Sequence, residues 1–320
     1  MTNPLAKQKK PRSRGAALRR IHDHWPMFLM TLPAVALLFC FNYLPMFGTL
    51  IAFKRYKVRQ GILGSKWMKP LFRNFEILFR KNSQAVVAIR NTLGLNLLFI
   101  AVGTVFAVLL ALMFNELNSR RYKKLAQSLS FLPYFISTVV VGIFVSSLLS
   151  YENGTINALI ASFGGTRINF YARPELWPGI LLITNIWKGA GYSSVVYLAA
   201  ISGIDATFYE AARIDGAGKW QEIRYITLPL LVPTITVLTL LSIGKIMNAD
   251  FGFFYNVTGD NPNLYATTDV LDTFIYRTLR QTGDMGISSA VGLFQSSVSL
   301  VLVLLSNWAA RRIDEGSALF

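Results

Sequence analysis

The sequence predicts an all-α polytopic membrane protein with six transmembrane helices. Hydrophobic residues make up 53% of its 320 residues and charged residues only 15%, whereas soluble domains carry about 25% charged residues. The mean hydropathy is +0.42. The apolar residues lie in runs of about 20 or more, which is the length that crosses the hydrocarbon core as a helix. Together these observations exclude an ordinary soluble enzyme.

The first apolar run follows a polar, basic N-terminal tail at 1–25. It is longer than the core of a signal peptide, which has about 7–15 residues, so we expect it to remain as a membrane helix. The expected spans, in chain order, are 27–52, 91–114, 125–149, 177–201, 228–248 and 287–310. They form one membrane domain over 26–310, and a second tail follows at 311–320.

Lysine and arginine in the connections indicate the orientation. With the N-terminus in the cytoplasm, the inner segments hold 16 of these residues, and the outer stretches 54–81, 150–176 and 250–286 hold 13, so both termini are expected to be cytoplasmic. Nine of the outer 13 lie in one stretch, 54–81, which we call the outer basic segment. Because the net charge of +16 comes from residues that flank membrane spans, it requires no nucleic-acid partner and is typical of contact with membrane lipid.

Several common kinds of site are missing from the sequence. Neither Gly-Lys pair is followed by Ser or Thr, so the chain has no Walker loop for ATP and its magnesium ion. The two histidines, His22 and His24, precede the first span, and the single cysteine, Cys40, lies within it. This distribution excludes a histidine-based catalytic triad or zinc site. We therefore expect no metal or cofactor in this chain.

The connection at 204–229 carries the most specific pattern of the sequence. Asp205 can cap a short helix that ends at Gly216, and Pro229 can open the next helix. On physical grounds alone, this connection could equally be an amphipathic segment on the lipid surface. The patterned residues are Glu210, Ala211, Ala212, Asp215, Gly216, Ile226, Leu228 and Pro229.

This pattern resembles the signature loop of permease subunits in binding-protein-dependent ATP-binding-cassette (ABC) importers. The resemblance implies a type I ABC importer permease fold and a cytoplasmic loop that couples the spans to an ATPase. It also implies a bacterial cytoplasmic (inner) membrane location and three kinds of partner. These are a second permease subunit, an ATPase dimer that binds ATP and magnesium, and an extracytoplasmic solute-binding protein.

Other stretches resemble the polysaccharide and oligosaccharide branch of these permeases. They include Asn42–Gly48 at the end of the first span, Asp269–Arg277 in the last outer connection and Ala290–Phe294 in the sixth span. The resemblance therefore implies an oligo- or polysaccharide substrate and a transporter subunit that is not itself an enzyme. A membrane enzyme acting on lipid-linked sugars and a purely structural anchor are the alternatives.

Polar residues within the expected spans predict the substrate path, since such residues face the interior of a helix bundle. Lys188 lies near the middle of the fourth span, where insertion of a lysine costs about 2.5–3.5 kcal/mol. Hydrogen bonding between helices, and for Lys245 snorkelling to the outer surface, are the competing explanations. The expected path residues are Thr184, Trp187, Lys188, Tyr192, Ser242, Lys245, Asn248, Gln295 and Ser299.

The outer basic segment suggests which kind of sugar passes. Its cations, among them Arg55, Lys57 and Arg59, lie on the side that normally has few positive charges. We therefore expect an acidic oligosaccharide of the uronate type found in alginate or pectin, because a carboxylate-bearing sugar is costly to move along a path without positive charge. Contact with an acidic protein partner or with anionic outer-leaflet lipid remains an alternative use of this segment.

Overall fold

The computed structural model describes residues 25–313, and within this range the chain is a bundle of helices without a named strand. The expected tails fall largely at 1–24 and 314–320, outside the described residues, as do His22 and His24. Within residues 25–313, four helices are long and apolar enough to cross a membrane: Trp25–Phe53, Gln84–Glu116, Lys219–Gly244 and Met285–Arg312. A bent helix pair gives a fifth candidate, and α10 (Trp177–Ser202) adds a helix of 26 residues at the expected fourth span.

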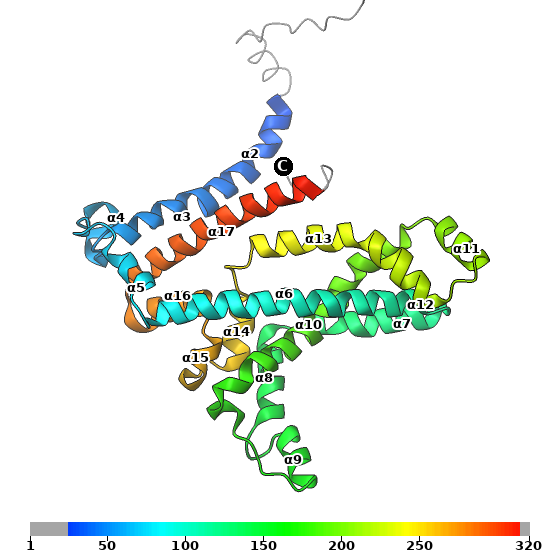
Figure 1. Ribbon diagram of the computed structural model, residues 1–320. Helices are drawn as coiled ribbons and strands as arrows, with labels where there is room; N and C mark the ends of the chain where they lie inside the picture. The colour runs from blue at the N-terminus through cyan, green and yellow to red at the C-terminus, as the bar shows by residue number, and fades with distance from the viewer. Residues whose placement is uncertain (1–24, 314–320) are drawn as a thin grey trace, which may run out of the picture.

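The first span is a chain of helical segments that lies beside the last helix, α17 (Met285–Ile313) (Figure 1). It runs through α2 (Trp25–Leu38), a π-helical turn, α3 (Leu44–Met46) and a 3₁₀ segment that ends at Phe53. Almost all of its described side chains are exposed, Cys40 among them, and Ala52 is buried. Such an apolar, uncovered surface fits contact with lipid or another subunit. Short helices α4 (Gly61–Gly64) and α5 (Glu76–Phe79) follow it.

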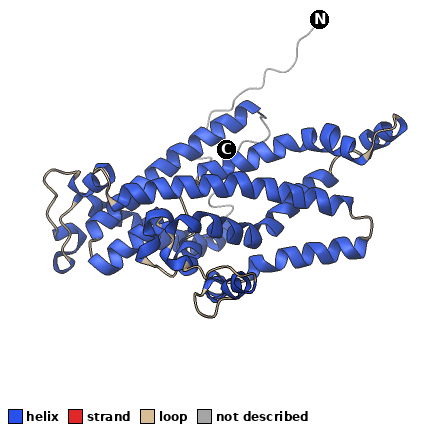
Figure 2. Cartoon of the chain, turned by 60° about the horizontal axis from the view of Figure 1, so that its bottom comes forward, coloured by secondary structure: helices blue, strands red, loops and turns tan. Residues whose placement is uncertain are grey.

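The centre of the bundle is formed by α6 (Gln84–Glu116), α10 and α13 (Leu228–Gly244), which run alongside one another (Figures 1 and 2). Small side chains of α6 allow this close packing. Ala107 and Ala111 are fully buried, against Tyr197 and Ile201 of α10 and Leu231 of α13. The helix α6 extends beyond the expected span 91–114 at both ends.

The expected third span, 125–149, is not one straight helix, because the chain breaks in its middle. Helices α7 (Arg120–Phe131) with its 3₁₀ extension to Phe135 and α8 (Thr138–Leu149) meet at an angle of 96°. Pro133 cannot continue a regular helix, and Ser137 starts a new one by accepting a hydrogen bond from the Val140 backbone N–H at 3.4 Å.

The fifth span also departs from the expected bounds, 228–248. Its helix already begins with α12 (Lys219–Glu222) and enters α13 through a π-helical turn at Ile223–Thr227. This turn accommodates Pro229, which therefore lies inside a continuous helix rather than at its start. At the other end α13 stops at Gly244, so Lys245 and Asn248 lie in the turns that follow.

The last connection is mostly helical and contributes much of the core. It contains α14 (Phe251–Thr258), α15 (Tyr265–Thr268) and α16 (Leu271–Arg277). Helix α14 packs against α8, whereas α15 and α16 pack against α6 (Figure 1). Helix α9 (Thr155–Ser162) extends from α8 at one end of the molecule. The buried side chains of this connection include Phe253, Phe254, Val257, Leu264, Val270 and Leu271.

Candidate functional site

The expected short helix in the connection at 204–229 is α11 (Ala206–Ile214), which projects from the far end of the bundle (Figure 1). The Asp205 carboxylate caps it by accepting a hydrogen bond from the Thr207 backbone N–H at 2.9 Å, and this bond lowers the pKa of Asp205. Gly216 has a φ of +81°, a left-handed conformation that favours glycine. The Ala217 N–H then reaches back to the Ala212 carbonyl at 2.9 Å and closes the helix end.

The surface of this projection is uncovered. Glu210 and Ala211 are exposed, and Ala212 is half-buried. The apolar side chains of Phe208, Ile214 and Trp220 are 53%, 87% and 72% exposed. An exposed apolar patch with a carboxylate beside it has the composition of a protein contact surface.

A buried carboxylate that sequence reasoning missed ties α11 to the spans. Glu222 accepts a hydrogen bond from Arg213 Nε at 2.8 Å and one from Lys219 Nζ at 2.9 Å. The Lys219 ammonium also lies 3.5 Å from a carboxylate oxygen of Glu116, the last residue of α6. The Glu222 carboxylate raises the pKa of the Arg213 guanidinium. This group of charges, the Glu222 clamp, connects α11 with both α12 and α6.

A cavity of about 560 Å³ lies between α6, α10 and the end of α13. We call it the central cavity. Four of the expected path residues line it: Tyr192, Ser242, Lys245 and Asn248. The structure adds polar side chains that were not expected there, namely Asn96, Thr104, Asn185 and Ser193. Among the described residues that line this cavity, Lys245 is the one that carries a charge.

Lys188 of α10 is not among the residues that line the central cavity. Its Nζ donates hydrogen bonds to the carbonyl oxygens of Tyr134 at 2.9 Å and Ile136 at 2.7 Å. These carbonyls belong to the break between α7 and α8. Near them, Gly191 brings α10 so close that an added Cβ would lie 1.9 Å from the Ser130 carbonyl oxygen. The lysine therefore satisfies backbone groups that the break leaves without helical partners.

The remaining path residues of α10 and α17 also lie outside the lining of the central cavity. Thr184 donates to the Ile180 carbonyl within its own helix, and Trp187 stacks on Phe144. Ser299 is buried, and its hydroxyl has no hydrogen-bond partner among the described residues.

Gln295 acts at the edge of the central cavity without lining it. Its Nε2 donates to the Met247 carbonyl at 2.9 Å, to Asn248 Oδ1 at 3.2 Å and to Asp272 Oδ2 at 3.1 Å. The same Asp272 oxygen accepts from the Ala249 backbone N–H at 2.9 Å. These contacts fix the turn that carries Lys245 and Asn248.

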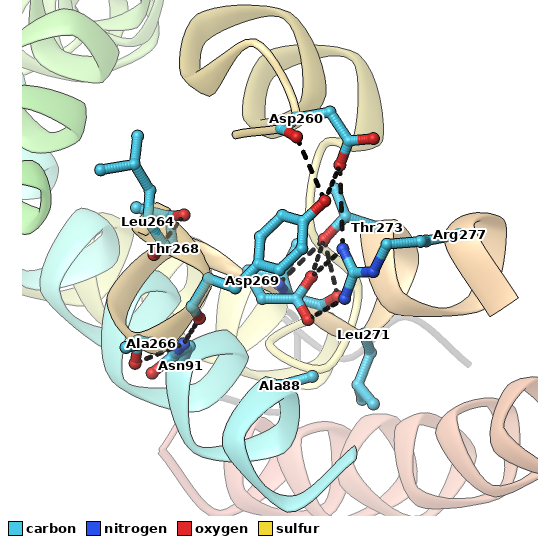
Figure 3. A network of polar contacts seen from close by, with 12 residues as sticks. Ala88, Asn91, Asp260, Leu264, Ala266, Thr268, Asp269, Leu271, Thr273 and Arg277 are labelled. Atoms are coloured by element: carbon cyan, nitrogen blue, oxygen red, sulfur yellow. Dashed lines mark hydrogen bonds and ion pairs between the residues drawn. The ribbon is translucent and has the colours of Figure 1, made fainter. Parts of the chain in front are cut away.

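A second network joins the last connection together, around Arg277 (Figure 3). The guanidinium makes a bidentate pair with buried Asp269 and stacks 3.8 Å from the ring centroid of Tyr265. The Tyr265 hydroxyl donates to Asp260 Oδ1 at 2.8 Å. Burial, followed by this hydrogen bond, raises the pKa of Tyr265 to about 12. A bidentate arginine–carboxylate pair with satisfied neighbours holds a fixed geometry.

The same connection is anchored to α6. Asn91 donates to the carbonyl oxygens of Tyr265 and Ala266, each at 3.3 Å, and the Leu271 N–H donates to Thr92 Oγ1 at 2.9 Å. Figure 3 shows Asn91 reaching the backbone of the Ala266 segment. We assign this network a structural role, which is to hold the last connection against the central helix.

The cations of the outer basic segment differ in their surroundings. Arg55, Lys57 and Arg59 are exposed, whereas Lys54 is buried and donates to the Ile62 carbonyl at 2.6 Å. Of the three exposed residues, Arg55 lines a large second cavity. Among the described residues, no group of three or more His, Cys, Asp or Glu side chains lies close enough to hold a metal ion.

Comparison with known proteins gives consistent results. Residues 103–316 match the family model of the binding-protein-dependent transport system inner membrane component. The chain is 36% identical over 307 residues to the polygalacturonan/rhamnogalacturonan transport system permease protein YteP of Bacillus subtilis (strain 168), covering 96% of this chain and 94% of that protein.

Two solved structures share the fold. A bacterial ABC transporter involved in the import of the acidic polysaccharide alginate matches with a TM-score of 0.83 and 38% identity, over 93% of this chain and 99% of that chain. A bacterial alginate ABC transporter in complex with alginate pentasaccharide-bound periplasmic protein matches with a TM-score of 0.82 and 39% identity, over 92% and 97%.

Proposed function

The chain belongs to the family of binding-protein-dependent transport system inner membrane components, and from this premise we propose that it lines the membrane path for an acidic oligo- or polysaccharide. It is the permease subunit of a sugar ABC importer and not an enzyme. The alternative, an enzyme acting on lipid-linked sugars, is not favoured because the relatives are transport permeases. The whole stretch 26–310 serves as the permease domain. ATP and magnesium belong to a separate ATPase subunit.

The observation that carries the substrate proposal is the position of Lys245 in the central cavity. A single cation among neutral polar side chains can receive one carboxylate at a time while hydroxyl groups bond to the asparagines. The relatives support the same chemistry, because polygalacturonan, rhamnogalacturonan and alginate all contain uronate units. Gln295 supports this site by fixing the turn that presents Lys245.

We assign ATPase coupling to α11 and its neighbours. The exposed patch around Glu210 would enter a cleft of the ATPase, and Gly216 would allow the sharp turn behind it. The Glu222 clamp would carry a displacement of α11 to α6 and α12, since a charged, hydrogen-bonded group moves as a unit more readily than a loose loop. This assignment puts α11 and both termini in the cytoplasm and the outer basic segment on the opposite side.

Uptake by the complete transporter tests the substrate proposal. Vesicles would contain this chain, its partner permease and the ATPase, with the solute-binding protein supplied on the outer side. We expect ATP-dependent uptake of a galacturonate pentasaccharide and little uptake of a neutral pentasaccharide of the same length. Preferred uptake of the neutral sugar would contradict the acidic-substrate proposal and leave the family assignment intact.

A further inference from the structure

A second cavity, larger than the central cavity, lies at the outer basic segment. It has a volume of about 1,620 Å³ and is formed by residues 54–84 together with 282–287, at the start of α17. In Figure 1 this is the end where α4 and α5 approach α17. We call it the outer cavity. Typical pockets for small ligands hold about 300–1,000 Å³, so this cavity has room for more than one sugar unit.

The outer cavity is held open by a fixed backbone. The Asn74 amide donates to the Ala52 carbonyl at 2.8 Å, and the Arg55 N–H donates to the Lys66 carbonyl at 2.9 Å. Gly286 of α17 approaches so closely that an added Cβ would lie 2.8 Å from Asn74 Nδ2. Because these contacts join the two chain segments, the cavity is a feature of the fold and not of one loose loop.

Positive charge dominates the lining of the outer cavity. None of its six exposed cations has an ion-pair partner among the described residues. Two acids, Glu76 and Asp284, also line it, and Asp284 is engaged in capping α17 through the Ile287 N–H at 2.9 Å. The six cations are Arg55, Lys66, Lys69, Arg73, Arg80 and Lys81. Like charges gathered in a concave surface create a strong local potential for anions.

Aromatic side chains stand among these cations. Tyr56 and Trp67 line the same cavity, and Trp67 is 55% exposed. Apolar faces beside separate charges match a sugar chain whose rings carry regularly spaced carboxylates. A flat lipid surface or protein surface would have little need of a concave site with aromatic walls.

We propose that the outer cavity is a receiving site for a uronate chain, which binds there through its carboxylates before it reaches the central cavity. This inference rests on the proposed function and adds a second, outer site for the same substrate class. The cations would hold the uronate chain near the membrane path, at a distance from Lys245. Because each contact is weak and the contacts are several, the uronate chain could then leave the outer cavity for the central cavity.

Direct binding separates this site from the central cavity and from its competitors. The probe is a fluorescent galacturonate pentasaccharide, titrated into the nucleotide-free complete complex in phosphatidylcholine nanodiscs without binding protein. We compare wild type, the pair Arg73→Glu with Arg80→Glu, and the control pair Arg167→Glu with Arg173→Glu. The control arginines are exposed and do not line the outer cavity.

We expect the dissociation constant to rise about tenfold in the Arg73 and Arg80 pair, with a smaller difference at high salt, and to stay within about twofold of wild type in the control pair. Unchanged affinity in the first pair, or equal loss in both pairs, would overturn the inference. In a separate titration with the solute-binding protein, a loss of its affinity in the first pair without any loss of pentasaccharide binding would also overturn the inference. Failure of the proposed function is a separate result, namely wild-type vesicles that do not import the pentasaccharide.

Discussion

Lys188 Nζ donates to the Ile136 carbonyl oxygen at 2.7 Å, and so links α10 to the point where the third span breaks. The same ammonium reaches the Tyr134 carbonyl at 2.9 Å and lies 5.7 Å from the Tyr134 ring centroid. A lysine in the middle of a span is costly unless its charge is satisfied. The break between α7 and α8 supplies carbonyl oxygens that accept hydrogen bonds from the lysine. The lysine in turn gives these carbonyl oxygens the donor that the interrupted helix lacks.

Replacing Lys188 with Met should therefore damage the fold more than substrate selection. Loss of the donor leaves the Tyr134 and Ile136 carbonyls short of a partner, which costs about 1–3 kcal/mol. We expect a lower midpoint of thermal unfolding for the purified complex, and uptake of the galacturonate pentasaccharide that falls in proportion to the loss of folded complex. Lys188→Arg, which keeps the donors, should recover part of both. Normal stability with a selective loss of uronate uptake would instead place Lys188 on the substrate path.

Lys245 should show the opposite behaviour. It is the charged residue of the central cavity, and it is exposed, with no ion pair to a described residue. For Lys245→Met we expect uptake of a galacturonate pentasaccharide to fall about tenfold, while ATP hydrolysis and stability change little. Lys245→Arg keeps the charge and serves as the control. Equal uptake by wild type and Lys245→Met would remove the electrostatic argument for an acidic substrate.

Local signals made part of this structure predictable. Asp205 and Gly216 mark the two ends of α11 in sequence, and the structure has a cap at the first and a φ of +81° at the second. The break in the third span was missed although Pro133 and Ser137 are visible in sequence. The long apolar run around them outweighed these two residues, because hydropathy measures composition and does not report direction.

Partners distant in the chain were the other source of missed features. The role of Lys188 depends on carbonyls more than 50 residues earlier, and the Glu222 clamp reaches Glu116 of α6 through Lys219. Arg55 lines the outer cavity whereas Lys57 and Arg59 do not, and this difference likewise depends on how the outer basic segment packs against α17. Spacing within one element cannot reveal contacts of this kind, since they arise from tertiary packing.

The exposed face of α11 gives a prediction about coupling. Glu210→Lys reverses a charge on the patch, and Gly216→Val puts a β-branched side chain at a positive φ. Both should reduce ATP-driven uptake about tenfold or more while the spans still insert and the chain is still expressed. Glu175→Lys, at an exposed site elsewhere, and Gly216→Asn, which tolerates a left-handed backbone, are the controls. Normal uptake and substrate-stimulated ATP hydrolysis in both test variants would leave α11 as a simple connector.

The Glu222 clamp predicts a loss of coupling without a change in the contact surface. Glu222→Gln keeps the size of the side chain but removes the charge that pairs with Arg213 and Lys219. We expect α11 to become more sensitive to limited proteolysis and uptake to fall several-fold, while the exposed patch around Glu210 is unaltered. Glu152→Gln, at an exposed acid, controls for the loss of one charge. Resistance of α11 to proteolysis in Glu222→Gln would show that the clamp is not needed to hold it.

The buried pair Asp269 and Arg277 should be one of the main supports of the last connection. Removing one member of a buried pair leaves an uncompensated charge, which typically costs about 3–5 kcal/mol. We therefore expect Asp269→Asn and Arg277→Met each to lower the midpoint of unfolding of the purified chain markedly. The double variant should lose less than the sum of the two, because it leaves neither charge unpaired. Additive losses would mean that Arg277 is held mainly by Tyr265 and Asp260, its other neighbours in the network.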